Sequence, residues 1–175
     1  MLTLRIATRA DMTEMSALMS AAIGQLMPAF LTPEQVVGSH ETMGIDTQLI
    51  DDGTYFAVEE DGVIVGCGGW SRRTTLYGGS NSAGRDDTPL DPTKDAARVR
   101  AMYTHPDHAR RGIGKMIIDA AETAARTDGF KRTTLGATLA GEPLYTKCGY
   151  VEVERHIKNA ANGATIPLLV MVKDI

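Results

Sequence analysis

Hydrophobic residues recur with two different periods near the start of the chain, and these periods predict its first elements. Alternation over residues 2–8 predicts a half-buried strand. Apolar positions in residues 12–23 are spaced by three and four, which predicts one buried face of a helix. Asp11 and Glu14 are suitably placed to cap that helix at its N-terminus. The chain is therefore expected to begin as a strand followed by a helix.

A second helix is expected to start where Thr32 precedes Pro33. Threonine is a good capping residue, and proline fits the first helical position because its missing N–H would have no partner there. Gly38 and Gly44 interrupt the segment that follows. We therefore expect this helix to be irregular or broken.

Two apolar runs, residues 55–59 and 63–70, predict a pair of strands joined by a hairpin turn at residues 60–62. Residues 72–95 are rich in Gly, Ser, Asn, Asp, Thr and Pro instead. So long a connection inside a compact domain is expected to be either disordered or functional.

The second half of the chain continues the alternation of strands and helices. The expected elements are a strand at 97–104, a helix from Gly112 with Gly129 ending it, a strand at 131–139, a short helix at 141–147, and an antiparallel pair at 150–158 and 165–173. No internal repeat and no domain boundary is visible. Residues 1–175 are therefore expected to form one α/β domain.

The helix expected near Gly112 has an unusual first turn. It carries Arg110, Arg111 and two glycines, Gly112 and Gly114, with no acidic side chain, although helix N-termini normally favour Asp or Glu. Free backbone N–H groups, the helix dipole and close approach at glycine would all suit a phosphate. The spacing fits neither the dinucleotide-binding nor the nucleoside-triphosphate loop. The pattern favours an anion-binding site, with a solvated turn as the alternative.

Composition narrows the class of protein further. The chain has 175 residues, 43% of them hydrophobic, and a net charge of −4, which argues against nucleic acid as the main partner. No apolar run is long enough to span a bilayer, and the N-terminus lacks the apolar core of a signal peptide. Cys67 and Cys148 have no histidines at metal-ligand spacing, so we expect free thiols, no metal and a reducing cytoplasm.

Two motifs carry a family resemblance. The first is MYTHPDHARRGIG at residues 102–114, and the second is PLYTKCGY at residues 143–150. Together with the order of elements, they resemble the GNAT superfamily of acetyl-coenzyme-A-dependent N-acyltransferases over nearly the whole chain. Ala109 departs from the Gln or Arg that the family often has there. The resemblance implies a mixed, mostly antiparallel sheet of about seven strands, flanked by helices and splayed between strands four and five.

The resemblance also implies acetyl-coenzyme A as co-substrate. Its pyrophosphate would rest on backbone amides, and its pantetheine arm would pair with the fourth strand like an extra strand. The residues assigned to the cofactor in this way are Met102, Tyr103, Thr104, Arg110, Arg111, Gly112, Ile113, Gly114 and Lys115.

The implied reaction moves an acetyl group to a primary amine of a small molecule by direct attack. Tyr145 lies where the family commonly has its general acid, and a phenol is a suitable proton donor; a packed tyrosine is the alternative. The fourth strand lacks the carboxylate that several members use as base. The base stays unassigned among Glu142, His105, His108, His40 and a water relay.

The acceptor site is expected near the third and fourth strands. Arg98 and Arg100 point the same way on an alternating strand and Arg72 lies nearby, so these arginines are candidates to recognise a carboxylate or phosphate. Trp70, Tyr77 and the loop of residues 72–96 are candidates for an acceptor wall or lid. The alternatives are solvated strand edges and salt bridges from the arginines to Asp86, Asp87 or Asp95, and a plain core role for Trp70.

Two other functions remain open. The missing carboxylate leaves room for a non-catalytic coenzyme-A-binding sensor or partner-binding module. A protein N-terminus or lysine is a further possible acceptor, which a wide open groove would favour, whereas a pocket closed by the 72–96 loop would favour a small metabolite. The apolar residues 168–171 either help a homodimer to form or fill the core.

Overall fold

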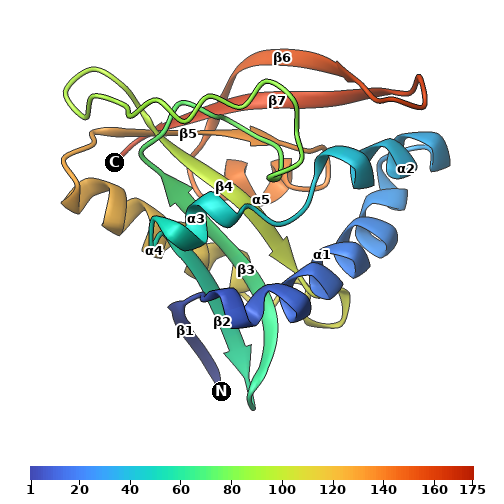
Figure 1. Cartoon of the computed structure of the whole chain (residues 1–175), viewed down its shortest axis with the longest axis horizontal. Helices are drawn as coiled ribbons and strands as arrows, with labels where there is room; N and C mark the ends of the chain where they lie inside the picture. Colours follow the sequence, from blue (N-terminus) through green and yellow to red (C-terminus); the bar gives the residue numbers. More distant parts are fainter.

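The computed structural model describes all 175 residues, which form a seven-stranded sheet with helices on both faces (Figure 1). The strands are ordered β1-β2-β3-β4-β5-β7-β6, and only the β4–β5 pair is parallel. The mixed, mostly antiparallel sheet is therefore confirmed. The strands are β1 (Leu2–Ile6), β2 (Tyr55–Glu60), β3 (Val63–Ser71), β4 (Ala97–Thr104), β5 (Arg132–Ala137), β6 (Val151–Asn159) and β7 (Thr165–Asp174). The helices are α1 (Met12–Leu26), α2 (Pro33–Thr42), α3 (Thr47–Asp51), α4 (Ile113–Thr127) and α5 (Glu142–Lys147).

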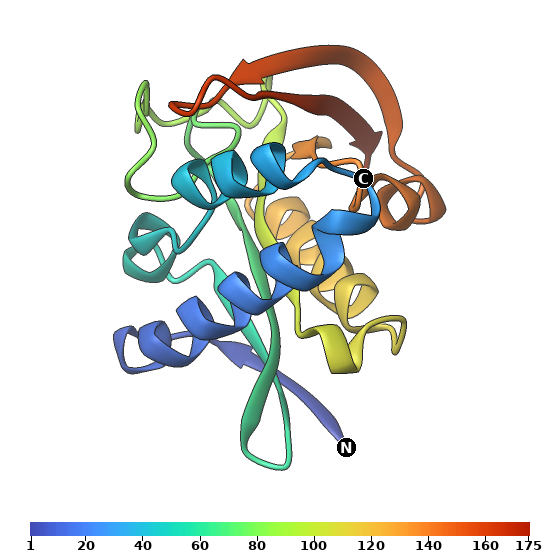
Figure 2. The same cartoon turned by 90° about the vertical axis from the view of Figure 1, so that its right-hand side faces the viewer.

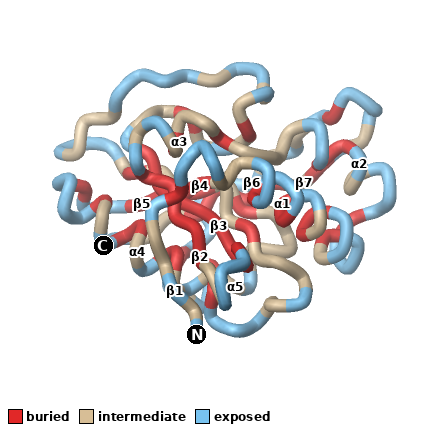
Figure 3. The backbone as a smooth tube through the Cα atoms, turned by 60° about the horizontal axis from the view of Figure 1, so that its bottom comes forward, coloured by how far each residue is buried: buried red, intermediate tan, exposed pale blue.

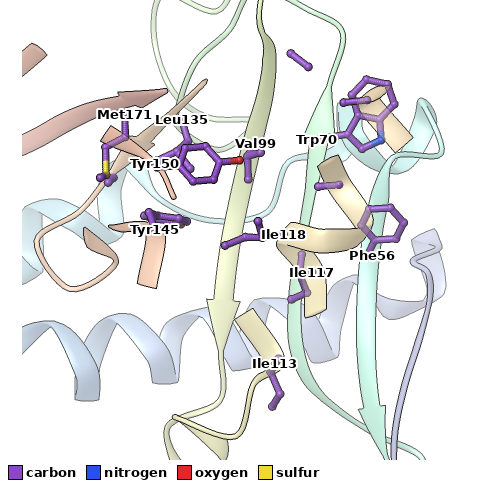
Figure 4. Close-up of a cluster of buried hydrophobic side chains, with 14 of the residues drawn as sticks. Phe56, Trp70, Val99, Ile113, Ile117, Ile118, Leu135, Tyr145, Tyr150 and Met171 are labelled. Carbon is purple, nitrogen blue, oxygen red and sulfur yellow. The ribbon is translucent and has the colours of Figure 1, made fainter. Parts of the chain in front are cut away.

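Two hydrophobic clusters lie on opposite faces of the sheet, and the alternation along β2 divides its side chains between them. Tyr55 and Ala57 pack with the buried residues of α1, whereas Phe56 and Val58 pack with those of α4. Figure 2 shows α1 and α2 on one side of the strands and α4 on the other. Figure 3 shows the central strands as the most deeply buried part of the chain, and Figure 4 shows the cluster around α4.

The sheet opens between β4 and β5. These strands pair only at Ala97 with Thr133 and at Arg98 with Thr134. Beyond that point β4 bulges against β3, and Ala101 takes a φ of +53°, which is rare for a residue with a β-carbon. The splay between strands four and five is therefore present, and it leaves one edge of β4 without a strand partner.

Most expected elements are confirmed, but α2 and α3 differ from expectation. Helix α2 runs unbroken through Gly38, where an added β-carbon would lie 2.5 Å from that of Ala160. The glycine thus lets the helix approach the β6–β7 hairpin rather than breaking it. Gly44 lies beyond the helix end. Helix α3 was not predicted, because five residues are too few to show a helical period.

Asp11 is the N-cap residue of α1, as predicted, but neither Asp11 nor Glu14 makes a capping hydrogen bond to this helix. Asp11 accepts a hydrogen bond from the Thr8 N–H at 2.7 Å, and so closes a 3₁₀ turn ahead of α1. Glu14 accepts from the Ile64 N–H, also at 2.7 Å, and so joins α1 to β3. Both carboxylates satisfy backbone donors, but in different places from the one the spacing predicted. Residues 168–171 are buried within the chain and fill its core.

The Asp11 carboxylate provides a pH-dependent test of this N-terminal packing. Arg5 donates hydrogen bonds to both its oxygens, at 2.8 and 2.7 Å, and holds the pKa of Asp11 well below its usual range. We expect Asp11→Asn to lower the free energy of unfolding by about 1–2 kcal/mol at neutral pH. Because the folded-state pKa is depressed, the loss should shrink as the pH falls below about 3.9, the unfolded value.

Urea unfolding at pH 7, 3 and 2 measures this difference. Asp61→Asn is the matched control, because its side chain is 90% exposed and the change should stay within about 0.5 kcal/mol at each pH. A destabilisation by Asp11→Asn that is the same at all three pH values would contradict the assignment.

Candidate active site

A cavity of about 240 Å³ lies where β4 and β5 separate. Its wall includes residues of α1, α5, the β6–β7 hairpin and the 72–96 loop. Several residues predicted for the site meet there, although they come from distant parts of the chain: Arg100, Met102, Tyr103, Thr104, Gly114 and Tyr145. The opening of the sheet is thus also the place where the candidate chemistry converges.

The N-terminus of α4 borders this cavity and has unpaired backbone donors. Gly112 is the N-cap with a φ of +86°, and no side chain caps the helix. The first intrahelical hydrogen bond runs from the Met116 N–H to the Gly112 carbonyl, so the N–H groups of residues 113–115 have no helical partner. A β-carbon on Gly112 would meet nothing within 4 Å, so the space before the helix is open. This arrangement can hold an anion.

Of the three cationic side chains at the start of α4, two form ion pairs and one does not. Arg111 makes a double ion pair with Glu60, at 2.7 and 2.6 Å, and Lys115 pairs with Asp119 one turn later. Arg110 makes no ion pair, and its φ of +63° is unusual for a residue with a side chain. Ile113 is buried in the core and anchors the helix. Arg110 is therefore the cationic side chain at this helix start that has no acidic partner.

Tyr145 presents a neutral phenol to the cavity. Its ring is 7% exposed and packs edge-on against Tyr150, with 6.1 Å between ring centroids (Figure 4). Burial raises the pKa of Tyr145 well above its usual range, and no hydrogen bond within the protein engages its hydroxyl. An added β-carbon at Gly141 would lie 2.8 Å from the ring, so the glycine makes room for it. A protonated, unengaged phenol can donate a proton but is a poor base.

The backbone of β4 is available on the side that faces β5. Tyr103 and Thr104 pair with Cys67 and Gly66 of β3, while no strand pairs with β4 on its other side beyond Arg98. An extended ligand with amide groups can add to such an edge. The Tyr103 hydroxyl accepts a hydrogen bond from the Gly44 N–H at 3.1 Å, which ties the end of α2 to this strand.

Arg98 and Arg100 both reach toward the 72–96 loop. Arg98 donates to the carbonyls of Thr74 and Ala96, both at 3.2 Å. Arg100 donates to the Gly78 carbonyl at 2.6 Å and forms a buried ion pair with Asp46 at 2.7 Å. The loop is therefore ordered by these arginines.

Trp70 and Arg72 lie outside the cavity lining. Trp70 is buried and packs edge-on against Phe130, 6.2 Å between centroids. Arg72 stacks over Trp70 and forms an ion pair with Asp128 at 3.0 Å. The alternative of salt bridges from the arginines to Asp86, Asp87 or Asp95 was wrong, because Arg72 pairs with Asp128 and Arg100 with Asp46. Arg98 forms no ion pair and donates only to backbone carbonyls.

None of the candidate bases lines the cavity. Its wall contains no Asp, Glu or His side chain, so Glu142, His105, His108 and His40 all lie elsewhere. Its neutral polar residues include Ser39, Thr42, Thr104 and Thr138. No group of His, Cys, Asp and Glu is arranged to hold a metal ion, and no helix is long and apolar enough to cross a membrane.

Among the residues of the site that sequence reasoning missed, four have a clear structural role. Ala101 forms the bulge, Lys158 lines the cavity from β6, and Gly136 and Gly141 give space to the rings of Tyr77 and Tyr145. The glycines were visible in the sequence, but their ring partners were not. Lys158 had no signal, because one lysine on an edge strand is ordinarily a solvated residue.

Known structures share the fold described above. A GCN5-related N-acetyltransferase from Rhodopseudomonas palustris superimposes with a TM-score of 0.73 at 22% identity, covering 99% of this chain and 95% of the other. YncA of Salmonella typhimurium, solved with its cofactor acetyl-CoA, gives 0.65 at 16% identity over 99% and 93%. The ribosomal-protein-S18-alanine N-acetyltransferase of Escherichia coli gives 0.60 at 15% identity over 100% and 94%.

At these identities the superpositions establish the fold. No curated protein sequence matches the chain. The model of the acetyltransferase (GNAT) family matches residues 23–150, which is well over half of the sequence and includes β4, α4 and α5. The chain therefore belongs to the GNAT acetyltransferase family.

Proposed function

We propose that this protein transfers the acetyl group of acetyl-coenzyme A to a primary amine of a small molecule. The observation that carries the proposal is the convergence of three features on one cavity: the unpaired amides of α4, the open edge of β4 and the free hydroxyl of Tyr145. The amides of residues 110–115 would hold the pyrophosphate. The β4 backbone at Met102, Tyr103 and Thr104 would pair with the pantetheine arm, so that the thioester points into the cavity.

The reaction needs one proton removed and one supplied. The neutral amine nitrogen attacks the thioester carbonyl carbon and forms the new C–N bond, and the C–S bond then breaks. Tyr145 donates its proton to the departing sulfur, and the proton lost by the nitrogen restores the phenol through water. The products are an amide and free coenzyme A, so atoms and charge balance. The raised pKa of Tyr145 supports its role as the donor.

The amine must lose its extra proton without a carboxylate or histidine at the cavity wall. We propose that the proton passes to solvent water, which a cavity with several hydroxyl side chains can admit. The 72–96 loop supports a small acceptor rather than a protein, because its residues Leu76, Tyr77 and Gly78 form part of the cavity wall. The two free cysteines are compatible with a cytoplasmic location.

Two measurements test the proposal together. Titration of coenzyme A into the protein in a calorimeter should release heat with a one-to-one stoichiometry. Acetyl-coenzyme A with a panel of small amines should release free thiol faster than without protein. Binding without amine-dependent thiol release would favour the non-catalytic sensor. Faster release with a peptide N-terminus than with any small amine would favour a protein acceptor, and absence of binding would end the proposal.

A further inference from the structure

The wall of the cavity has an unbalanced charge. It includes two cationic side chains, Arg100 and Lys158, and no acidic one. Arg100 forms a buried ion pair with Asp46, a carboxylate that also pairs with Arg85 outside this wall. Lys158 makes no ion pair and no hydrogen bond to the protein, and burial lowers its pKa. Lys158 therefore brings to the wall a positive charge that no acid of the protein pairs with, and its partial burial makes that charge costly.

The position of Lys158 is fixed by aromatic packing. Its ammonium lies 5.1 Å from the centroid of the Tyr77 ring. That ring rests on Gly136 of β5, where an added β-carbon would be only 3.1 Å away. The next residue, Gly78, is held by Arg100 through its carbonyl. The loop, β4, β5 and β6 thus combine to hold the ammonium over the Tyr77 ring, and Lys158 lines both this cavity and an adjoining one that includes Asp86.

The rest of this part of the wall is mainly apolar. Side chains from α1, the end of α2, the 72–96 loop and β7 contribute, including Ile23, Leu26, Met27, Met43, Leu76, Ile166 and Leu168. An acceptor that fills the space is therefore expected to have an apolar body. A second positive charge on the acceptor would meet Lys158 without any acid to balance it.

We propose that the acceptor is a small primary amine that also carries a carboxylate and an apolar portion, and that Lys158 binds the carboxylate beside Tyr77. The inference rests on the proposed acetyl transfer and names the substrate class of the same site. The acceptor carboxylate supplies the charge partner that Lys158 lacks in the protein. Polyamines and other acceptors with two positive charges are disfavoured by the same charge.

Matched acceptors isolate the contribution of the carboxylate. Leucine, methionine and 6-aminohexanoate are each compared with their primary amides at equal concentrations of the neutral amine, because loss of the carboxylate also lowers the pKa of the nearby amine. We expect Lys158→Met to raise KM for the acids by about 10- to 100-fold, because a charge-assisted hydrogen bond is lost. The kcat values and the KM for the amides should stay nearly unchanged. Lys131→Met is the control, because Lys131 is exposed and outside the cavity.

The outcomes separate this inference from the proposed function. A wild-type enzyme that acetylates the amides or spermidine as efficiently as every acid overturns the inference and leaves acetyl transfer standing. A Lys158→Met variant that still prefers the carboxylate acceptors over their amides also overturns the inference without affecting the proposed acetyl transfer. A fall in kcat at unchanged KM would make Lys158 a proton acceptor instead of a carboxylate ligand, and would also overturn it. If no amine leads to thiol release although coenzyme A binds, the proposed function itself is contradicted.

Discussion

Replacing Tyr145 with phenylalanine should lower kcat by roughly 10²–10⁴-fold while the affinity for coenzyme A stays unchanged. The change removes one hydroxyl that makes no hydrogen bond within the protein and leaves the ring in its packing against Tyr150. The folded structure should therefore be kept, because the cavity wall loses only one polar atom. Thiol release at saturating substrates measures kcat, and calorimetry measures the affinity for coenzyme A.

Tyr150 provides a matched control in the same cluster. Its hydroxyl forms a buried hydrogen bond with that of Thr133 at 2.9 Å and does not line the cavity. Tyr150→Phe should therefore lower stability by about 1 kcal/mol and leave kcat unaltered. Equal losses of kcat in the two variants would mean that the cluster matters for packing only, and the role of Tyr145 as acid would be abandoned.

The pH dependence gives an independent check on Tyr145. A general acid works only while protonated, so the rate falls as the pH rises through its pKa. Because burial raises the pKa of Tyr145 above the ordinary phenol value of about 10, that fall should begin only at still higher pH. In the wild type, kcat should rise with pH as the amine loses its proton, without a decline between about pH 8 and 9.5. A decline in that range would require another acid.

The sequence predicted the fold well wherever a period or a turn extends over many residues. The apolar stripe of α4, the alternation in the strands and the turn at residues 60–62 are all local signals, and the structure confirms them. Helix α3 and the bulge at Ala101 gave no such signal. The bulge results from how β3 and β4 pair, which is a tertiary property that no residue in the sequence encodes by itself.

The sequence predicted the part of the candidate site that is formed by backbone groups. The amides at Gly112 and Gly114 and the edge of β4 follow from one contiguous motif, so that motif could be read directly. The acceptor wall is built from side chains far apart in the sequence. Lys158 meets Tyr77 only because the β6–β7 hairpin lies against the 72–96 loop. Arg98 and Arg100, two of the three arginines expected to bind the acceptor, instead donate hydrogen bonds to the loop.

Gly112→Asp should weaken coenzyme A binding roughly 100-fold more than Gly112→Asn, because a carboxylate would stand before the amides proposed to hold the pyrophosphate. The pair is matched in size, and Asn and Asp both tolerate the positive φ of this position better than most residues. A side chain here enters open space rather than the core. Calorimetry with coenzyme A measures both affinities, and the gap should narrow in 1 M salt, where charges are screened within about 3 Å.

Thermal unfolding without ligand separates this electrostatic effect from damage to the fold. An acidic residue at the start of α4 would interact favourably with the helix dipole and should make the free protein slightly more stable than Gly112→Asn, by about 0.3–1 kcal/mol. Stability and coenzyme A affinity should therefore move in opposite directions between the two variants. A misfolded loop would lower both together. If both variants bind coenzyme A equally well, the pyrophosphate does not lie at α4, and the proposed placement of the cofactor fails with it.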